Sequence, residues 1–183
     1  CYSVIDERSA AFFALGIARQ LHKPVAIVCT SGTAALNYSP AIAEAYYQNV
    51  PVIAITADRP ANLIGKQDGQ TIIQNNIFKN FTISSVNIAD NSSPKYINKT
   101  KIKLSNLIAN AIDNYKPAHI NIQFNEPLYQ TIEIDNYLTY NIPPKQKNTI
   151  GKALIDTLVN QWNKTEKIAI VVGANLPDDN LSV

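Results

Sequence analysis

Five consecutive apolar residues, Val25 to Cys29, constrain the fold of this 183-residue chain more than any other feature. The run lacks polar alternation and is rich in β-branched residues, which is typical of a strand buried on both faces of a parallel sheet. A helical pattern precedes it: Asp6 is a good N-cap, apolar residues recur at helical spacing, and His22-Lys23-Pro24 ends the pattern. We therefore expect a helix at residues 7–21 packed beside a strand at 25–29.

The same alternation of strands and helices continues along the chain. Further strands are expected at residues 1–5, 51–57, 81–88 and 118–124, and further helices at 33–48 and 102–115. Pro40 lies inside the helix at 33–48, so this helix either begins near Pro40 or is kinked there. Residues 61–80 are polar and aperiodic, which indicates a long functional or mobile loop. The pattern predicts an α/β fold, a three-layer sandwich with a mostly parallel sheet.

A change of composition marks a second unit near the C-terminus. Residues 135–148 contain Pro143-Pro144 and are interpreted as an interdomain linker. Beyond them, a helix around 154–162 and a strand at 167–172 would begin another α/β unit, whose incomplete sheet should leave apolar surface exposed. The chain contains no methionine, so Cys1 is not a natural start, and we interpret the chain as a fragment of a longer protein.

Composition excludes several functional classes. A formal net charge of +2 without a basic cluster does not indicate nucleic-acid binding, and no apolar run reaches the roughly 20 residues needed to cross a bilayer. Cys1 and Cys29 have neither metal-ligand spacing nor a disulfide framework, and His22 and His119 suggest no metal or base role. Since no signal peptide is recognised, the cytoplasm is the default location.

The strongest functional candidates each follow an expected strand. In parallel sheets, ligands bind beyond the carboxyl ends of the strands, and Glu7, the Ser31-Gly32-Thr33 turn and Arg59 are all expected at that edge. Each also has an ordinary structural explanation. An acid in the first turn of a helix complements the helix dipole, Ser-Gly-Thr is common turn chemistry, and Arg59 can pair with Asp58 or another acid.

Four segments taken together carry a specific resemblance. Asp6-Glu7-Arg8, the stretch Thr30 to Ala35, Thr56 to Pro60, and Gln70 stand in the order and spacing of one family. They resemble the pyrimidine-binding domain of the thiamin-diphosphate-dependent synthases of menaquinone biosynthesis, the MenD family. The resemblance covers residues 1 to about 130. It implies a pyrimidine-binding (PYR) domain at 1–134 that lacks its first strand and helix, a linker at 135–148, and the beginning of the central domain at 149–183.

The resemblance also implies roles for individual residues. Glu7 would be catalytic, because the family's glutamate at this point hydrogen-bonds N1′ of the cofactor's aminopyrimidine and so promotes loss of the thiazolium C2 proton. Ser31, Gly32 and Thr33 would approach the aminopyrimidine ring as further cofactor contacts. Arg59 and Gln70 match substrate-contacting positions, and a guanidinium suits a carboxylate. No residue of this chain is expected to bind a metal, and Glu126, which matches a family segment, receives no role.

The activity implied by the resemblance is decarboxylation of 2-oxoglutarate followed by 1,4-addition of the resulting carbanion to isochorismate. The cofactors would be thiamin diphosphate and Mg²⁺ or Mn²⁺, with the diphosphate and the metal held by a domain absent from this chain. The family's active site is shared between subunits, so the partner is a second subunit of a homodimer or homotetramer. The fragment alone is therefore expected to be inactive.

Two other interpretations are weighed against this one. Another thiamin-diphosphate enzyme, such as an acetolactate-synthase-like protein or a decarboxylase, is disfavoured by Ala57-Asp58-Arg59-Pro60 and by Thr33, where acetolactate enzymes have proline. A non-catalytic nucleotide- or phosphate-binding module is conceivable at the Ser31-Gly32-Thr33 turn, although no Gly-x-Gly-x-x-Gly or Walker motif is present. Asp68-Gly69 and Asn75-Asn76 superficially resemble a magnesium–diphosphate motif, but neither follows a buried strand.

Overall fold

The computed structural model describes residues 1–125 and 149–171. The chain divides into two units between Pro143 and Pro144, and each unit is described by itself. Glu126, the predicted linker at 135–148 and the predicted turn at 173–175 lie outside the described residues. The assignment of the units to named domains stays a prediction.

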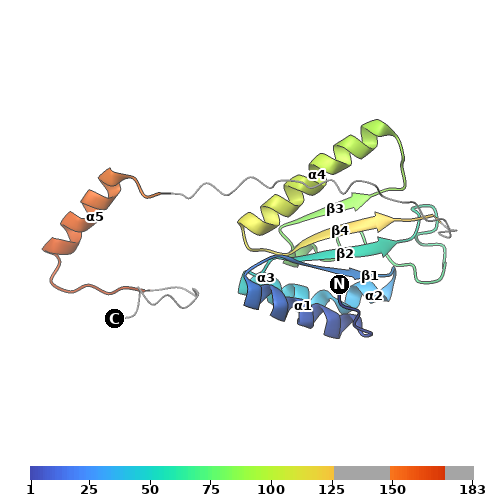
Figure 1. Ribbon diagram of the computed structural model, residues 1–183, viewed down its shortest axis with the longest axis horizontal. Coiled ribbons are helices and arrows are strands. Elements are labelled where there is room, and N and C mark those ends of the chain that lie inside the picture. The colour runs from blue at the N-terminus through green and yellow to red at the C-terminus, as the bar shows by residue number, and fades with distance from the viewer. Residues whose placement is uncertain (126–148, 172–183) are drawn as a thin grey trace. The chain divides into compact units, whose positions relative to one another are not determined.

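The first unit is built on a four-stranded, all-parallel sheet with strand order β1-β2-β4-β3. The strands are β1 (Val25–Cys29), β2 (Val52–Asp58), β3 (Ser84–Ile88) and β4 (Ala118–Gln123). Their carboxyl ends meet at one edge, toward which the arrows point in Figure 1. The expected strands at 25–29, 51–57, 81–88 and 118–124 are confirmed, and β3 is an edge strand as expected.

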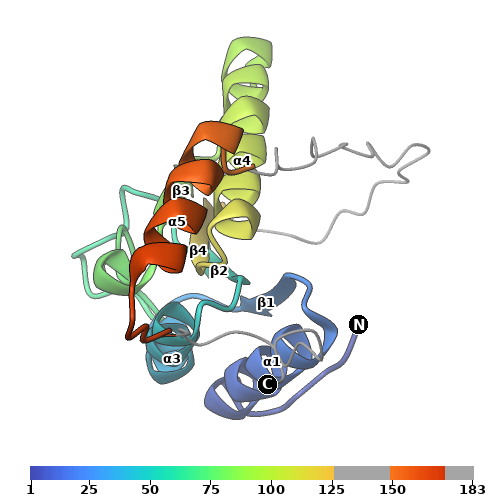
Figure 2. The ribbon, with the colours of Figure 1, turned by 90° about the vertical axis from the view of Figure 1, so that its left-hand side faces the viewer.

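Helices cover both faces of this sheet, which confirms the layered α/β architecture. Helices α1 (Glu7–Leu21), α2 (Thr33–Asn37) and α3 (Ser39–Gln48) lie on one face and α4 (Pro94–Asp113) on the other (Figure 1); Figure 2 shows α1, α3 and α4 from the end of the sheet. Two apolar cores result, one around Leu15, Ile42 and Val52 and one around Ile53, Leu107 and Ile120. The helix expected at 102–115 begins earlier, at Pro94, because proline is compatible with the first helical turn.

Helix α1 has the predicted bounds and the predicted cap. The Asp6 carboxylate accepts a hydrogen bond of 2.7 Å from the backbone N–H of Ser9, and His22 ends the helix in the left-handed conformation with φ of 53°. Alanines form the buried surface between α1 and α3, where small side chains let the helices pack closely. They are Ala11, Ala14, Ala18, Ala41 and Ala45.

The expected helix at 33–48 is divided in two. Helix α2 ends at Asn37 and α3 begins at Ser39, so Pro40 lies in the first turn of α3. Of the two predicted alternatives, a helix start near Pro40 is therefore the correct one. Tyr38 lies at the junction, and its side chain is buried between the sheet and the helices. The break therefore directs Tyr38 into the core below the end of β1.

In the long segment 61–80, two side chains are fully buried, and a third, Ile77, packs partly buried against the core. Gln74 and Phe78 are both buried, and a short 3₁₀ helix, η1 (Lys79–Phe81), follows. The Phe78 ring meets the His119 ring edge-to-face, with centroids 4.8 Å apart. Because His119 belongs to β4, the segment covers part of the sheet on the same side as α3.

Two predictions at the start of the chain are wrong: the strand at residues 1–5, and the burial of the strand at 25–29 on both faces. Residues 1–5 form no strand because they pair with no neighbour among the described residues; instead, the Tyr2 ring packs against that of Phe13 on α1. Strand β1 is not buried on both faces, since Val28 is 71% exposed. The cause is the position of β1 at the edge of the sheet, where α4 does not cover it; α4 packs on β2, β3 and β4.

The second unit contains α5 (Lys152–Lys164), as predicted. The strand expected at 167–172 is absent from residues 167–171, which have no partner strand in the described part of the unit. As expected, apolar residues of α5 are exposed, among them Leu158 and Trp162. None of the helices in the described residues is long and apolar enough to span a membrane.

Truncation of Ile42 tests the packing of α3 on α1 and β2. Ile42 is fully buried, so Ile42→Ala should lower the free energy of unfolding by about 2–5 kcal/mol through lost burial and an unfilled cavity. Leu21→Ala is the matched control; Leu21 is 57% exposed, so its loss should cost less than about 1 kcal/mol. Urea unfolding of both variants measures the difference, and equal costs would contradict the described core.

Candidate functional site

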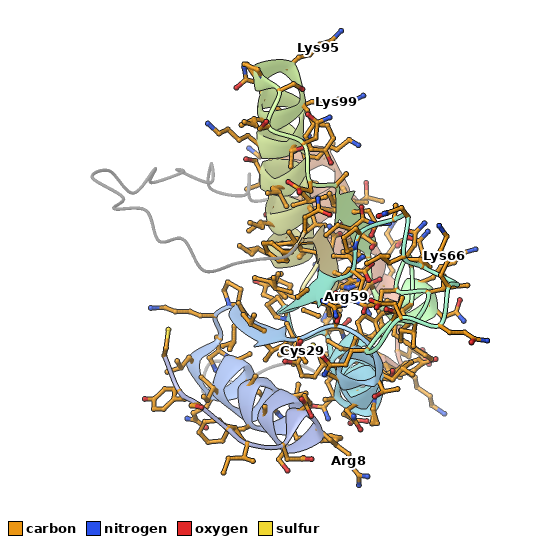
Figure 3. The ribbon with its side chains drawn as sticks, turned by 90° about the vertical axis from the view of Figure 1, so that its right-hand side faces the viewer. Arg8, Cys29, Arg59, Lys66, Lys95 and Lys99 are labelled. Atoms are coloured by element: carbon orange, nitrogen blue, oxygen red, sulfur yellow. The ribbon has the colours of Figure 1, made fainter. Side chains whose placement is uncertain are left out.

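The carboxyl edge of the sheet gathers most of the predicted site residues. Strands β1 and β2 end there, and the start of α1 lies beside α2 (Figure 1). Figure 3 looks onto this edge and shows Cys29 and Arg59 near its centre, whereas Arg8 points away from it. The region is therefore a candidate site assembled by three separate segments of the chain.

Glu7 is the first residue of α1 and is half-buried. Within the described residues, its carboxylate makes no hydrogen bond and no ion pair. Burial raises the pKa of Cys29 to about 11; the hydrogen bond from the Tyr38 hydroxyl opposes this rise in pKa, and the Glu7 charge adds to it. Burial, the nearby Cys29 and, to a lesser degree, Glu7 also raise the pKa of Tyr38. The Glu7 charge thus acts on the pKa of both groups at the end of β1.

The Ser31-Gly32-Thr33 turn connects β1 to α2, which begins at Thr33. Ser31 and Gly32 are buried and Thr33 is exposed. Gly32 has a φ of +81°, and a Cβ placed on it would lie 2.8 Å from the Gln70 carbonyl oxygen. Glycine is therefore required here, because the Gln70 backbone lies directly against it. From the sequence, Gln70 was expected to contact the substrate, whereas the turn was expected to contact the cofactor.

Arg59 follows β2 directly, and its side chain is 24% exposed. Its Nε lies 3.3 Å from Oδ2 of Asp68 and donates to the Gly69 carbonyl at 3.4 Å. A salt bridge with a neighbouring acid, one of the two explanations considered from the sequence, is thus present, and the acid is Asp68. These contacts also bring Arg59 next to Gly69 and hence to Gln70, whose side chain is exposed.

A buried chain of hydrogen bonds lies behind this surface. Gly32 N–H donates to Oε1 of Gln74 at 2.7 Å, and Nε2 of Gln74 donates to the Ala57 carbonyl at 2.8 Å and to Oδ1 of Asn121 at 2.9 Å. Asn121 Nδ2 then donates to Oδ2 of Asp58 at 2.7 Å. One glutamine and one asparagine therefore connect the turn after β1 to the ends of β2 and β4.

The direction of every bond in this chain follows from its fixed ends. A carboxylate oxygen of Asp58 only accepts, so the Asn121 amide nitrogen must face Asp58 and its oxygen must face Gln74. The Gly32 N–H only donates and the Ala57 carbonyl only accepts, so the Gln74 amide has a single satisfactory orientation. Neither amide can be reversed without leaving buried groups unpaired.

A branch of the same network reaches His119. Thr56 Oγ1 donates to Oδ1 of Asn121 at 2.7 Å and lies 2.9 Å from Nε2 of His119, while Nδ1 of His119 lies 3.4 Å from Ser85 Oγ. Because the Thr56 hydroxyl has one hydrogen, His119 donates from Nε2 and accepts at Nδ1. Burial lowers the pKa of His119 to about 4, which agrees with a neutral ring.

The network formed by Gln74, Thr56, Asp58 and Asn121 was not predicted from the sequence. A signal was available in the strands: Thr56 and Asp58 alternate on β2, as His119 and Asn121 do on β4, inside otherwise apolar runs. Polar residues two apart share one face of a buried strand, where they need partners. The partner Gln74 lies in an aperiodic segment, and no pattern distinguished it from its neighbours.

The chemical character of the site fits an amine-bearing heterocycle. A half-buried carboxylate near the strand ends can accept from, or share a proton with, a ring nitrogen, and exposed Thr33 and Gln70 offer hydroxyl and amide groups. The described residues contain no group of three or more His, Cys, Asp or Glu side chains placed to hold a metal ion. The arrangement is thus suited to orienting an organic group and controlling a proton on it.

Comparison with known families shows what the first part of this chain is similar to. Residues 1–81 match the family described as thiamine pyrophosphate enzyme, N-terminal TPP binding domain. These residues contain α1, the glycine turn, Arg59, Gln70 and Gln74. The resemblance of this domain to thiamin-diphosphate-dependent enzymes, expected from the sequence, is thereby confirmed.

Particular relatives narrow the resemblance further. The chain is similar to proteins named 2-succinyl-5-enolpyruvyl-6-hydroxy-3-cyclohexene-1-carboxylate synthase. It is 45% identical to that of Flavobacterium psychrophilum over 97% of this chain and 32% of the relative, and 44% identical to that of Christiangramia forsetii over 97% and 33%. The resemblance to the MenD family is thereby confirmed, and the chain spans about a third of the length of these relatives.

The neutral state of His119 predicts a specific loss of stability in acid. Well above pH 6.5 the imidazole is neutral in the folded and unfolded chains, and as the pH falls through 6.5 toward 4 the unfolded chain takes up the proton before the folded chain does. Stability should therefore fall across this window, by about 3 kcal/mol from this residue. Urea unfolding from pH 7 to 4 should show a weaker dependence for His119→Gln, whereas exposed His22→Gln should behave as wild type.

The proximity of Glu7 to Cys29 can be measured without any ligand. Because the Glu7 charge contributes to the raised pKa of Cys29, Glu7→Gln should lower that pKa and speed alkylation of Cys29 by iodoacetamide at pH 9, where only about 1% of the wild-type thiol is ionised. The same change at Glu44, on the exposed surface of α3, is the control. Mass spectrometry of labelled peptides gives the rates, and an unchanged Cys29 rate in Glu7→Gln would place the carboxylate elsewhere.

Proposed function

We propose that this chain is the pyrimidine side of a thiamin-diphosphate-dependent synthase that decarboxylates 2-oxoglutarate and adds the product to isochorismate in menaquinone biosynthesis. The family that residues 1–81 match and the names of the similar proteins support the class and the pathway. The single observation that carries the site assignment is the position of Glu7, a half-buried carboxylate at the strand ends without a protein partner in the described residues.

The residues of this chain would orient the cofactor rather than perform its chemistry. Thiamin diphosphate, when bound, supplies a nucleophilic carbon that stabilises the charge left by decarboxylation. Glu7 would hold a proton at the N1′ atom of the aminopyrimidine, and the Ser31-Gly32-Thr33 turn would line the ring. The half-buried position of Glu7 limits water around its carboxylate, which would strengthen a carboxyl–nitrogen hydrogen bond.

Arg59 and Gln70 would contact the substrates. Both proposed substrates are dicarboxylates, and a guanidinium can engage both oxygens of a carboxylate. Arg59 already has Asp68 at its Nε, which orients the side chain. We propose that this ion pair presents the guanidinium group toward the substrate side of the loop, next to the exposed Gln70.

The remaining parts of the proposal concern groups outside these residues. The diphosphate and a divalent metal, Mg²⁺ or Mn²⁺, would be held by other parts of the longer protein, and a second subunit of a homodimer or homotetramer would complete each site. The cytoplasm is the proposed location. This chain alone would then be inactive.

The phosphate-binding alternative loses support at the glycine turn. The N–H of Gly32 donates to Gln74 and is not available to an anion, and α2 has only five residues. A helix terminus binds phosphate through free backbone N–H groups, and in this turn the N–H of Gly32 is already bonded to Gln74.

Replacement of Glu7 tests the proposed function. In the full-length enzyme with thiamin diphosphate, Mg²⁺ and both substrates, Glu7→Gln should lower turnover at least about 100-fold, because the amide keeps the shape but cannot exchange the proton. Glu44→Gln should retain wild-type turnover. Isochorismate consumption with and without 2-oxoglutarate provides the measurement, and near-normal turnover of Glu7→Gln would refute the assignment.

A further inference from the structure

Gln74 connects the two segments to which different ligands are proposed. Its Oε1 accepts from Gly32 in the turn after β1, and its Nε2 donates to Ala57 and Asn121 at the ends of β2 and β4. Four residues earlier on the same segment, the Gln70 backbone packs against the face of Gly32 that lacks a side chain. The loop is thus attached to the turn at two points, by packing at Gln70 and by hydrogen bonding at Gln74.

The burial of Gln74 excludes direct contact with a ligand. The residue is 1% exposed, and both amide atoms are used within the protein. Its effect must therefore act through the residues that it holds. Without its oxygen, the buried N–H of Gly32 would lose its acceptor, and without its nitrogen, the loop would lose its attachment to β2 and β4.

We propose that Gln74 is a positioning residue that fixes the Ser31–Thr33 turn and the Arg59–Gln70 loop in one relative arrangement. The turn is the proposed cofactor contact and the loop the proposed substrate contact, so a single amide sets the spacing between the two ligands. This inference rests on the proposed function for the identity of those ligands. The attachment itself is independent of it.

Two variants of the full-length enzyme separate this role from general stability. Gln74→Met has similar length and removes all three hydrogen bonds, whereas the control Thr56→Val removes the bonds to Asn121 and His119 but leaves Gln74 and Gly32 in place. Amide hydrogen exchange of the ligand-free protein reports on the Gly32 amide and on residues 66–72. Calorimetry reports thiamin diphosphate affinity in the presence of Mg²⁺.

In Gln74→Met, we expect amide exchange at Gly32 and across 66–72 to be at least about tenfold faster, which is the effect of losing one buried hydrogen bond. In Thr56→Val, exchange at these amides should change little. The dissociation constant for thiamin diphosphate and the KM for 2-oxoglutarate or isochorismate should both rise in Gln74→Met. Arg59→Lys should raise a substrate KM alone. If Gln74→Met folds poorly, Gln74→Glu replaces it: the variant keeps an acceptor for the Gly32 N–H but loses the donor to Ala57 and Asn121, so exchange across 66–72 should be faster than in the wild type and exchange at Gly32 should change less.

Distinct results overturn the inference and the proposed function. Unchanged exchange at Gly32 in Gln74→Met, or faster exchange with unchanged cofactor affinity and KM, would refute the positioning role while leaving the enzyme assignment intact. Equal effects of Gln74→Met and Thr56→Val would also refute it, by reducing Gln74 to a contributor to stability. Failure of the wild-type enzyme to bind thiamin diphosphate would instead refute the proposed function.

Discussion

The hydrogen bond between the side chains of Asn121 and Gln74 joins the two halves of the site. On one side, Asn121 is oriented by the Asp58 carboxylate; on the other, Gln74 is oriented by the N–H of Gly32 and the carbonyl of Ala57. Each amide is satisfied in only one orientation, so the network has a single low-energy arrangement. The network thereby connects the ends of β2 and β4 to the turn after β1, although β1 and β4 are not paired in the sheet.

This network explains why a long, aperiodic segment follows a defined course. Seven of the twenty residues at 61–80 are apolar, but only Phe78 among these seven is fully buried, together with the polar Gln74. Phe78 adds apolar area and an edge contact with His119, and Gln74 supplies the polar contacts. Gly32 permits the approach, because any side chain there would collide with the Gln70 backbone. The segment's path thus depends on glycine in one place and glutamine in another.

Local patterns in the sequence predicted the first unit well where the structure depends on local chemistry. The α1 cap at Asp6, the helix break near Pro40 and the buried run of β2 all follow from capping, proline geometry and apolar composition. The predictions failed where the outcome depends on neighbours: residues 1–5 and 167–171 have strand-like composition but no partner strand in the described residues. Gln74 was missed for the same reason, since its role is set by contacts 42 and 47 positions away.

Stability alone does not account for the polar network. On β2, Val52 and Ala54 face the same side as Thr56 and Asp58, so the strand's inner face changes from apolar to polar toward its carboxyl end. Apolar side chains of similar size would be expected to pack there at comparable or better free energy, because buried polar groups gain little net stability even when fully paired. What the polar groups add is direction: a hydrogen-bonded amide fixes the orientation of its partners, whereas apolar packing tolerates displacement. The polar end of the strand is also the end at which Arg59, the glycine turn and Glu7 converge, and there the relative placement of side chains matters more than the free energy of burial.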